Sequence, residues 1–293
     1  RGMILSIDVC LDPMPMRVAF LGPEGTYGER AARSLMRLEA IENPELVACS
    51  GLRSVVEHVA DGRCESAVVP VENSVEGGVT AILDALWSYS NLRIRRAVVL
   101  PIRHALLSSG SLDGISEVLS HPQALAQCSG WLAGHLPQAV QLPASSTAEA
   151  ARMVRGSHFR AAIADRSLAG QQGLQELAYP VNDVPGNRTR FLLLQNGDEV
   201  SCEGDVASLA FSLHKNAPGA LIEALQAIGD LGLNMSRIES RPSKRELGEY
   251  VFFVDVELPG QQTAELLQRL TTSLQPLCEH VLHFGAYPSS VME

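Results

Sequence analysis

The sequence predicts an α/β domain followed by a smaller α+β domain of the ferredoxin-like kind. From Met16 to about Leu194, short apolar runs alternate with amphipathic segments, which is typical of a sheet flanked by helices. From Asp205 onward the order becomes β-α-β-β-α-β. The 293 residues fit two domains of ordinary size, and 46% hydrophobic with 19% charged residues is typical of a globular protein.

In the first domain, turn signals separate the expected elements. A strand at 17–21 passes through a glycine-rich turn into a helix that runs to Leu38. Further strands are expected at residues 67–71, 115–119, 161–164 and 189–195, and a long extended run broken by Pro101 at 94–107. Helices are expected at about residues 78–88, at 123–135 behind Pro122, and at 146–154, where Ser146, Thr147 and Glu149 fit a capping box.

The second domain is expected to span residues 205–288. Its first strand alternates Leu209, Phe211 and Leu213 with polar residues, and a helix after Pro218 carries an apolar stripe. Strands follow at 234–240, 250–258 and 281–284, with a helix after Gln261 before the last one. Along 250–258 apolar residues alternate with Phe253, Asp255 and Glu257, so we expect one face of this sheet to be wet. The polar residues 196–204 form a linker, and residues 1–15 form an N-terminal extension.

Charge and cysteine usage exclude several classes of protein. The net charge of -10, with a pI near 5.3, argues against a nucleic-acid partner, because such binding needs a concentrated basic surface. An anionic ligand would need local positive groups. The six cysteines form no C-x-x-C pair, and His280 and His283 point to opposite faces of an expected strand, so we predict no metal site. No window is apolar enough to span a bilayer, which predicts no membrane partner and a cytoplasmic location.

Two junctions between a strand and a helix carry sequences suited to binding a ligand. The glycine-rich turn 22–28 would let backbone N–H groups approach an anion at a positive helix end, although its glycine spacing differs from the dinucleotide fingerprint. Glu72, Asn73 and Ser74 stand at the end of a strand, where polar groups face a cleft on a rigid edge. An ordinary turn and a simple helix cap are the respective alternatives.

Two further segments extend this pattern. Ser120 precedes a helix that carries Gln123 and Gln127 on one face, where neutral donors can hold carboxylates or a hydroxyl. Arg188 and Arg190 bracket Thr189 in the segment 186–191, so arginines can pair with an anion while the hydroxyl donates a hydrogen bond. A solvated helix start and a basic loop that offsets an acidic surface are the alternatives.

Together these segments resemble prephenate dehydratase from Met16 to Leu194. Five stretches match the family pattern in the right order: Gly22-Pro23-x-Gly25-Thr26, Val71-Glu72-Asn73-Ser74, Ser120-His121-Pro122-Gln123 with Gln127-Cys128, Ser146-Thr147-Ala148, and Asn187-x-Thr189-Arg190-Phe191. Gly28 departs from the pattern, since relatives usually carry a serine there. No single stretch is specific, but five in order are.

The second half resembles an ACT regulatory domain of the phenylalanine-sensing kind. Pro218-Gly219-Ala220-Leu221 and Ile238-Glu239-Ser240-Arg241-Pro242 match its two ligand-contacting stretches, and Asn234-Met235-Ser236 departs mildly from the usual Asn-Leu-Thr. The resemblance implies that phenylalanine binds between paired ACT domains, through residues Gly219, Ala220, Leu221, Asn234, Glu239 and Ser240. It also implies a homo-oligomer, a dimer or a tetramer.

For the first domain the resemblance implies a two-lobed fold like that of periplasmic binding proteins, with the cleft between the lobes and the domain spanning residues 16–195. The implied reaction is the decarboxylating dehydration of prephenate to phenylpyruvate, without a cofactor. The residues expected in catalysis are Thr189, Glu72, Asn73, Ser120 and Gln127. Those expected to bind the substrate are Thr26, Ser74, Gln123, Ser146, Thr147, Arg190 and Phe191.

Thr189 would donate to the leaving hydroxyl, and Arg190 would bind a carboxylate. Because a threonine hydroxyl is weakly acidic, Glu72, or a water held by Asn73 and Gln127, is the alternative ultimate proton donor. Two other functions are compatible with the same motifs: an arogenate dehydratase, and a two-lobed amino-acid sensor without turnover. We expect no fused chorismate mutase, since no further helical domain precedes Met16.

Overall fold

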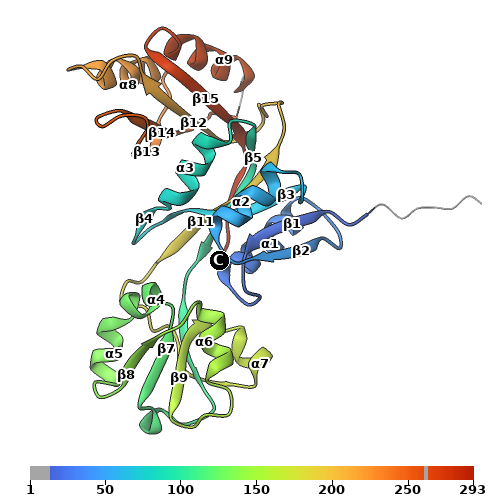
Figure 1. The fold of residues 1–293 in the computed structure, drawn as a ribbon, viewed down its shortest axis with the longest axis vertical. Coiled ribbons are helices and arrows are strands. Elements are labelled where there is room, and N and C mark those ends of the chain that lie inside the picture. The colour runs from blue at the N-terminus through green and yellow to red at the C-terminus, as the bar shows by residue number, and fades with distance from the viewer. Residues whose placement is uncertain (1–13, 261–262) are drawn as a thin grey trace, which may run out of the picture.

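The computed structural model describes residues 14–260 and 263–293, and three tiers are visible in Figure 1. The second domain forms the top tier, and the first domain supplies a middle lobe (lobe 1) and a bottom lobe (lobe 2). Most of the expected N-terminal extension, residues 1–13, lies outside the described residues. Within the described ranges, no helix is long and apolar enough to cross a membrane.

Lobe 1 is a seven-stranded sheet in the order β16-β5-β11-β3-β1-β2, with β4 paired to β3. Its strands are β1 (Arg17–Leu21), β2 (Glu45–Cys49), β3 (Ser66–Asn73), β4 (Gly77–Gly78), β5 (Leu92–Pro101), β11 (Arg188–Asn196) and β16 (Ser289–Val291). Helix α1 (Tyr27–Leu38) covers one face, while α2 (Leu52–Ala60) and α3 (Thr80–Ser88) cover the other. The strand β2 and the helix α2 were not predicted from the sequence.

Lobe 2 is a five-stranded sheet in the order β10-β6-β9-β7-β8. Its strands are β6 (His104–Ser108), β7 (Glu117–Ser120), β8 (Val140–Pro143), β9 (Arg160–Asp165) and β10 (Gln175–Ala178). Its helices are α4 (Pro122–Gln127), α5 (Ser129–His135), α6 (Thr147–Met153) and α7 (Leu168–Gln172), with a 3-10 turn at Leu112–Gly114. The single helix predicted at 123–135 is broken at Cys128, because the Asp183 carboxylate accepts from the N–H groups of Gly130 and Trp131 and starts a new helix there.

Two segments cross between the lobes and are hydrogen bonded to each other. The first joins β5 to β6 and the second joins β10 to β11. Ile102 N donates to Asn187 O at 2.8 Å, and His104 N donates to the Asn182 side chain at 2.6 Å. The long extended run broken by Pro101 is therefore the first crossing, and the two-lobed arrangement expected from the resemblance is confirmed.

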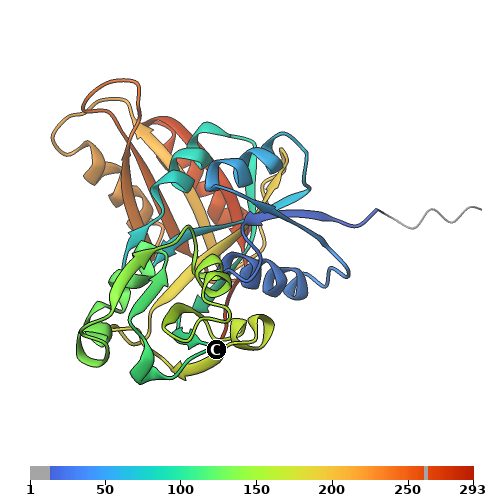
Figure 2. The ribbon, with the colours of Figure 1, turned by 60° about the horizontal axis from the view of Figure 1, so that its bottom comes forward.

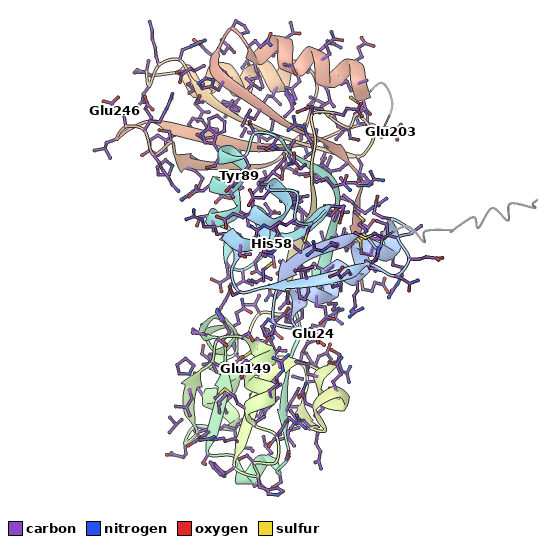
Figure 3. The ribbon with its side chains drawn as sticks, turned by 45° about the vertical axis from the view of Figure 1, so that its right-hand side comes forward. Glu24, His58, Tyr89, Glu149, Glu203 and Glu246 are labelled. Atoms are coloured by element: carbon purple, nitrogen blue, oxygen red, sulfur yellow. The ribbon has the colours of Figure 1, made fainter. Side chains whose placement is uncertain are left out.

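The lobes also touch away from the crossings. In Figure 2, where the bottom of the molecule comes forward, α1 lies beside lobe 2, and Arg30 of α1 pairs with Asp165 at the end of β9 at 3.1 Å. Figure 3 labels Glu24 in lobe 1 and Glu149 in lobe 2 on the two sides of this boundary. Arg152 of lobe 2 donates to Glu24 O at 2.7 Å across it.

The second domain has the predicted β-α-β-β-α-β order, which confirms the ferredoxin-like arrangement. Its elements are β12 (Val206–Leu213), α8 (Ala220–Asp230), β13 (Met235–Pro242), β14 (Tyr250–Glu257), α9 (Thr263–Leu274) and β15 (Cys278–Tyr287), with the antiparallel sheet order β13-β14-β12-β15. Both helices pack on one face of this sheet.

The expectation of a wet second face is wrong. Phe253 and Asp255 are 2% and 1% exposed. Phe253 belongs to the same apolar cluster as Leu86 of α3 and Ile94 of β5, so lobe 1 covers the face that the alternation assigned to solvent. The chain then returns to lobe 1, where β16 pairs in parallel with β5 beyond the expected domain end at residue 288. The sheet of the second domain is thus attached to lobe 1 both by packing and through the chain itself.

Candidate active site

A cavity of about 670 Å³ lies between the two lobes, within the size range of small-molecule sites. Lobe 1 contributes the ends of β1, β3 and β11 and the loop after β3, while lobe 2 contributes β6 and the starts of α4 and α6. The polar side chains in its wall include Thr26, Asn73, Thr80, His104, Gln123, Gln127, Ser146, Thr147 and Thr189.

Helix starts supply the positive potential of this cavity. Five helices begin at its wall, and residues of their first turns or caps line it: Thr26 for α1, Leu52 for α2, Thr80 for α3, Gln123 for α4 and Ser146 for α6. Among the described residues, no lysine or arginine lines the cavity. Since a helix start carries partial positive charge and unpaired N–H groups, this wall attracts anions without a formal cation.

The starts of α2 and α3 remain the most open to a ligand. Their N-cap residues are Gly51 and Val79, whose side chains cannot accept a hydrogen bond from the first turn. In contrast, Thr26 accepts from Glu29 N at 3.4 Å and Ser146 accepts from Glu149 N at 3.0 Å. A carboxylate in the cavity therefore finds its free N–H donors at α2 and α3.

Asn73 and Thr189 form the centre of the site. They face each other on the neighbouring strands β3 and β11, and both are buried. Asn73 Oδ1 accepts from the backbone N–H groups of Val75 and Glu76 at 2.9 and 3.0 Å, which identifies that atom as the oxygen. Its Nδ2 donates to Thr189 Oγ1 at 2.8 Å. Because Thr189 accepts this bond, its own proton is available to a ligand in the cavity.

The same bonding pattern extends across the lobe boundary. Asn73 Nδ2 also donates to Asn187 Oδ1 at 2.9 Å, and Asn187 Nδ2 donates to Gln127 Oε1 at 3.2 Å. Gln127 Nε2 in turn donates to Glu76 at 3.3 Å. The sequence motifs that contain Asn73, Gln127 and Thr189 are therefore brought together into one hydrogen-bonded chain.

His104 and Tyr27 line the cavity but were not recognised in the sequence as site residues. His104 is 3% exposed, lies 3.1 Å from Gln127 Oε1 through its Nε2, and lies 3.3 Å from the Tyr27 hydroxyl through its Nδ1. Burial lowers the pKa of His104, and burial raises the pKa of Tyr27 well above its usual value. His104 lies within an apolar run whose sequence predicts a strand and gives no sign of a binding site.

The structure contradicts the expected positions of Arg190 and Glu72. Both lie next to cavity residues on their strands, so strand alternation turns their side chains to the opposite face. Arg190 pairs with Glu72 at 3.3 Å and with the buried Asp255 of the second domain. Burial acts to lower the pKa of Arg190, but Asp255, Tyr287 and Glu72 together outweigh it and the pKa is raised. Arg190 therefore joins the two domains and does not line the cavity.

Three hydroxyl residues of the expected set hold the backbone. Ser120 Oγ donates to Ile163 O at 2.6 Å inside lobe 2 and is fully buried, so it does not reach the cavity, contrary to its expected catalytic role. Ser74 accepts from Arg188 N at 2.9 Å and lies outside the cavity wall, contrary to its expected substrate contact. Thr26 does line the cavity, but its hydroxyl lies within hydrogen-bond distance of Leu21 O and Pro23 O, 3.0 Å from each.

The remaining expected residues lie in the cavity wall. They are Gln123, Ser146, Thr147 and Phe191, the last of which is 4% exposed. The structure adds Glu76. Among the described residues that line the cavity, Glu76 supplies the side-chain carboxyl group that was expected from Glu72. Thr80 was also missed, because nothing in its local sequence distinguishes it from an ordinary helix start.

The residues expected to bind phenylalanine occupy two different surfaces. Gly219, with φ of 87°, precedes α8, whose first residues are Ala220 and Leu221. Ser240 is exposed, whereas the neighbouring Glu239 faces lobe 1. A Cβ added at Gly78 of the cavity wall would overlap the Glu239 carboxylate. The side chain of Asn234 donates to Glu257 at 2.8 Å. Glu239 therefore belongs to the contact between domains.

No group of three or more His, Cys, Asp or Glu side chains that could hold a metal ion occurs in the described part of the chain. His283 contacts the Thr271 hydroxyl at 2.7 Å through its Nε2, while His280 stacks edge-on against Trp87. The two histidines expected on opposite faces thus have separate partners.

Comparison with known proteins agrees with this architecture. The family model for prephenate dehydratase matches residues 18–199, and that for the ACT domain matches residues 207–270. A bifunctional chorismate mutase/prephenate dehydratase of Neisseria gonorrhoeae is 39% identical over 282 residues, covering 95% of this chain and 76% of the relative.

Two solved structures are similar over nearly the whole chain. Prephenate dehydratase of Arthrobacter aurescens in complex with L-Phe is 34% identical, with a TM-score of 0.82 over 93% of this chain and 90% of that one. GqqA, described as a novel type of quorum quenching acylase, is 29% identical, with a TM-score of 0.77 over 94% and 98%. The match of the dehydratase family model to more than half of the chain decides the family. This chain belongs to the prephenate dehydratase family and carries a C-terminal ACT domain.

Proposed function

We propose that this protein is a carbon–oxygen lyase that converts prephenate to phenylpyruvate in phenylalanine biosynthesis, under feedback control by phenylalanine. The observation that carries this function is the Thr189 hydroxyl, which accepts a hydrogen bond from Asn73 and keeps its proton for a ligand. It lies in a cavity whose helix starts favour anions. Family membership agrees with this activity.

The reaction suits such a site because aromatisation supplies its driving force. The bond between the ring and its carboxylate breaks, and its electron pair enters the ring as the carbon–oxygen bond to the ring hydroxyl breaks. The carboxylate leaves as carbon dioxide, and the hydroxyl leaves as water once it has taken up one proton. The enzyme therefore has to position the substrate and assist the leaving hydroxyl, and the reaction as written needs no cofactor.

Thr189 donates its hydrogen bond to the leaving hydroxyl. Because a threonine hydroxyl is weakly acidic, a second group has to replace the proton. Glu76, the carboxyl group of the cavity wall, is placed for this role through its hydrogen bond from Gln127, and it takes over the role expected of Glu72. A water held by Asn73 and Gln127 is the alternative donor.

The substrate carboxylates bind to the helix starts. The backbone N–H groups in the open first turns of α2 and α3 donate hydrogen bonds to one carboxylate. Gln123, Ser146 and Thr147 offer neutral donors from lobe 2. Phe191 places apolar surface in the same wall, which favours loss of the carboxylate that leaves as neutral carbon dioxide.

Phenylalanine is the proposed effector, bound by paired ACT domains in a homo-oligomer, a dimer or a tetramer, in the cytoplasm. The relative from Arthrobacter aurescens was solved with L-Phe, which supports this assignment. The exposed Ile238 on the edge strand β13 and the exposed Tyr250 at the start of the neighbouring strand β14 suit contact with a second copy.

Three alternative functions can be distinguished from prephenate dehydration: an arogenate dehydratase, an amino-acid sensor and an acylase. An arogenate dehydratase would use the same residues on a substrate with an amino group, and a sensor would bind anions without turnover. An acylase would need a nucleophile activated by a base. Thr189 instead receives its hydrogen bond from an amide, which argues for a hydrogen-bond donor and against a nucleophile.

The decisive experiment is a turnover assay of the purified protein. Prephenate is expected to give phenylpyruvate, read by its ultraviolet absorbance in alkali, with arogenate assayed in parallel and phenylalanine added to half of the samples. A sample without protein serves as the control for the acid-catalysed background. Product formation no faster than in that control would refute the enzyme assignment.

A further inference from the structure

His104 is a buried titratable group that the reaction described above does not use. It is the first residue of β6, where the crossing segment enters lobe 2. Its backbone is held on both sides, since its N–H donates to Asn182 at 2.6 Å and its carbonyl accepts from Val181 N at 2.9 Å. The ring is therefore fixed in the wall of the cavity at the boundary between the lobes.

The hydrogen bonds of its neighbours determine which ring nitrogen carries the proton. Asn73 is oriented by two backbone N–H groups, and this orientation passes through Asn187 to Gln127. Because Asn187 Nδ2 donates to Gln127 Oε1, the Gln127 amide nitrogen is the atom that faces the Glu76 carboxyl group. Gln127 Oε1 consequently faces His104 Nε2, and two acceptors cannot be paired, so Nε2 must carry a proton.

The other ring nitrogen faces lobe 1. His104 Nδ1 lies 3.3 Å from the Tyr27 hydroxyl, which also lies 3.0 Å from Arg103 O. In the neutral ring Nδ1 is an acceptor, and the Tyr27 proton satisfies it. In the charged ring Nδ1 donates to the Tyr27 oxygen, whose proton then turns to Arg103 O. The bond from Nε2 to Gln127 is present in both states.

We propose, on the basis of the proposed function, that His104 is a positioning residue for this reaction. Its Nε2–H orients the Gln127 amide and, through Asn187 and Asn73, the Thr189 hydroxyl. Its Nδ1 ties this chain of side chains to Tyr27 of the other lobe. The bonded series runs from Tyr27 in lobe 1, through lobe 2, and back to Thr189 in lobe 1.

The charged and titratable groups around His104 suit a neutral, orienting ring. Asp165 faces it from the neighbouring strand β9, but this carboxylate is paired with Arg30 of α1 at 3.1 Å. Cys128 is buried and Tyr27 is half-buried; burial raises the pKa of Tyr27 well above its usual value and that of the Cys128 thiol to about 12, so both stay uncharged. Burial lowers the pKa of His104 itself.

The test compares two substitutions of this residue by steady-state kinetics. His104→Gln keeps an N–H near the Nε2 position, whereas His104→Leu removes it at similar size. We expect the leucine variant to lose about 10- to 100-fold in kcat with a much smaller change in KM, because a misplaced hydroxyl affects the chemical step most. The glutamine variant should recover most of that loss. His135→Leu, at an exposed position of α5, is the matched control.

The pH profile and a double substitution separate positioning from other roles. Because Nε2–H persists in both protonation states, His104→Gln should keep the acid limb of kcat/KM where it is in the wild type. Introducing His104→Leu into the Gln127→Ala variant should lower kcat far less than His104→Leu does in the wild type, since both residues act through the same series of hydrogen bonds. Equal losses in the leucine and glutamine variants, or fully additive losses, would overturn the proposal.

A readout without substrate keeps this proposal distinct from the proposed function. Nitrogen chemical shifts of ¹⁵N-histidine-labelled protein, assigned by comparison with His104→Gln, should show an Nε2–H ring at neutral pH. An Nδ1–H ring would overturn the proposal even if turnover is normal, whereas an Nε2–H ring in a protein without turnover would count only against the function. If His104→Leu does not fold, His104→Asn, whose amide is too short to reach Gln127, should show the same kinetic loss.

Discussion

Asn73 donates a 2.8 Å hydrogen bond to the hydroxyl of Thr189, its partner in register on the neighbouring strand. Asn73 cannot turn its amide around, because the backbone N–H groups of Val75 and Glu76 hold its oxygen. The acceptor side of the Thr189 hydroxyl is thus occupied by a rigid donor. This relationship makes the threonine a directed donor toward the cavity.

Removal of the Thr189 hydroxyl should affect turnover strongly. Thr189→Ala is expected to lower kcat by about 10²-fold or more, since assistance to proton transfer contributes that much in other enzymes. Thr189→Ser, which restores the hydroxyl without the methyl group, should recover much of the rate. Initial rates of phenylpyruvate formation measure both. A near-normal rate for the alanine variant would exclude the donor role.

Asn73→Asp tests the direction of the central hydrogen bond. The aspartate still accepts from the backbone N–H groups of Val75 and Glu76, so the loop after β3 keeps both of these hydrogen bonds. It cannot donate to Thr189 or Asn187, and its charge repels an anionic substrate. We expect kcat/KM to fall by about 10²-fold or more, with little change in the far-ultraviolet circular dichroism spectrum. Retained activity would show that Thr189 needs no donor at this position.

Arg190→Met tests whether this residue binds substrate or joins the domains. Because Arg190 pairs with the buried Asp255, its loss should reduce the free energy of unfolding by about 3–5 kcal/mol. KM for prephenate should stay close to the wild-type value. Arg188→Met, on the same strand, is the control for loss of one positive charge. A tenfold rise in KM, about 1.4 kcal/mol, would restore the expected carboxylate contact.

Acid should weaken the contact between the two domains through Asp255. Burial acts to raise its pKa, but Arg190 and Arg237 outweigh burial and hold the pKa below its usual value. The stabilisation is therefore complete above about pH 4, the pKa of an unfolded aspartate, and is lost as the pH falls through the lower folded-state pKa. Urea unfolding between pH 7 and 3 should show this loss. Asp255→Asn should be less stable at pH 7 and should show a smaller acid dependence.

The two neighbouring residues Glu239 and Ser240 should affect phenylalanine inhibition in different ways. Ser240→Ala alters the exposed face and should raise the phenylalanine concentration needed for half inhibition. Glu239→Ala removes the carboxylate that abuts Gly78 of the cavity wall, so it should reduce the maximal inhibition. Changes of about 5- to 150-fold are the usual range of allosteric coupling. Inhibition curves at fixed prephenate measure both, and an unaffected wild-type enzyme would contradict the regulatory role.

Much of the fold was predictable because its signals are local. The strand at 17–21, the helix to Leu38 and the β-α-β-β-α-β order of the second half depend on apolar spacing and turn residues, and the structure contains all of them. The strand β2, which has only five residues, was not predicted, and neither was the helix α2, although Val55, Val56 and Val59 give it a buried apolar face. The helix at 123–135 was predicted whole because Asp183, which interrupts it, lies far along the chain.

The active site, too, was predictable only in those features that depend on local sequence. The sequence by itself determined which segments carry the chemistry, because Asn73, Gln127 and Thr189 stand at the ends of recognisable elements. Only the tertiary structure decided which side chains face the cavity, because strand alternation and domain packing are not visible in a motif. They turn Glu72 and Arg190 toward the regulatory domain, place His104 beside Gln127, and leave helix starts to attract the anion in place of an arginine.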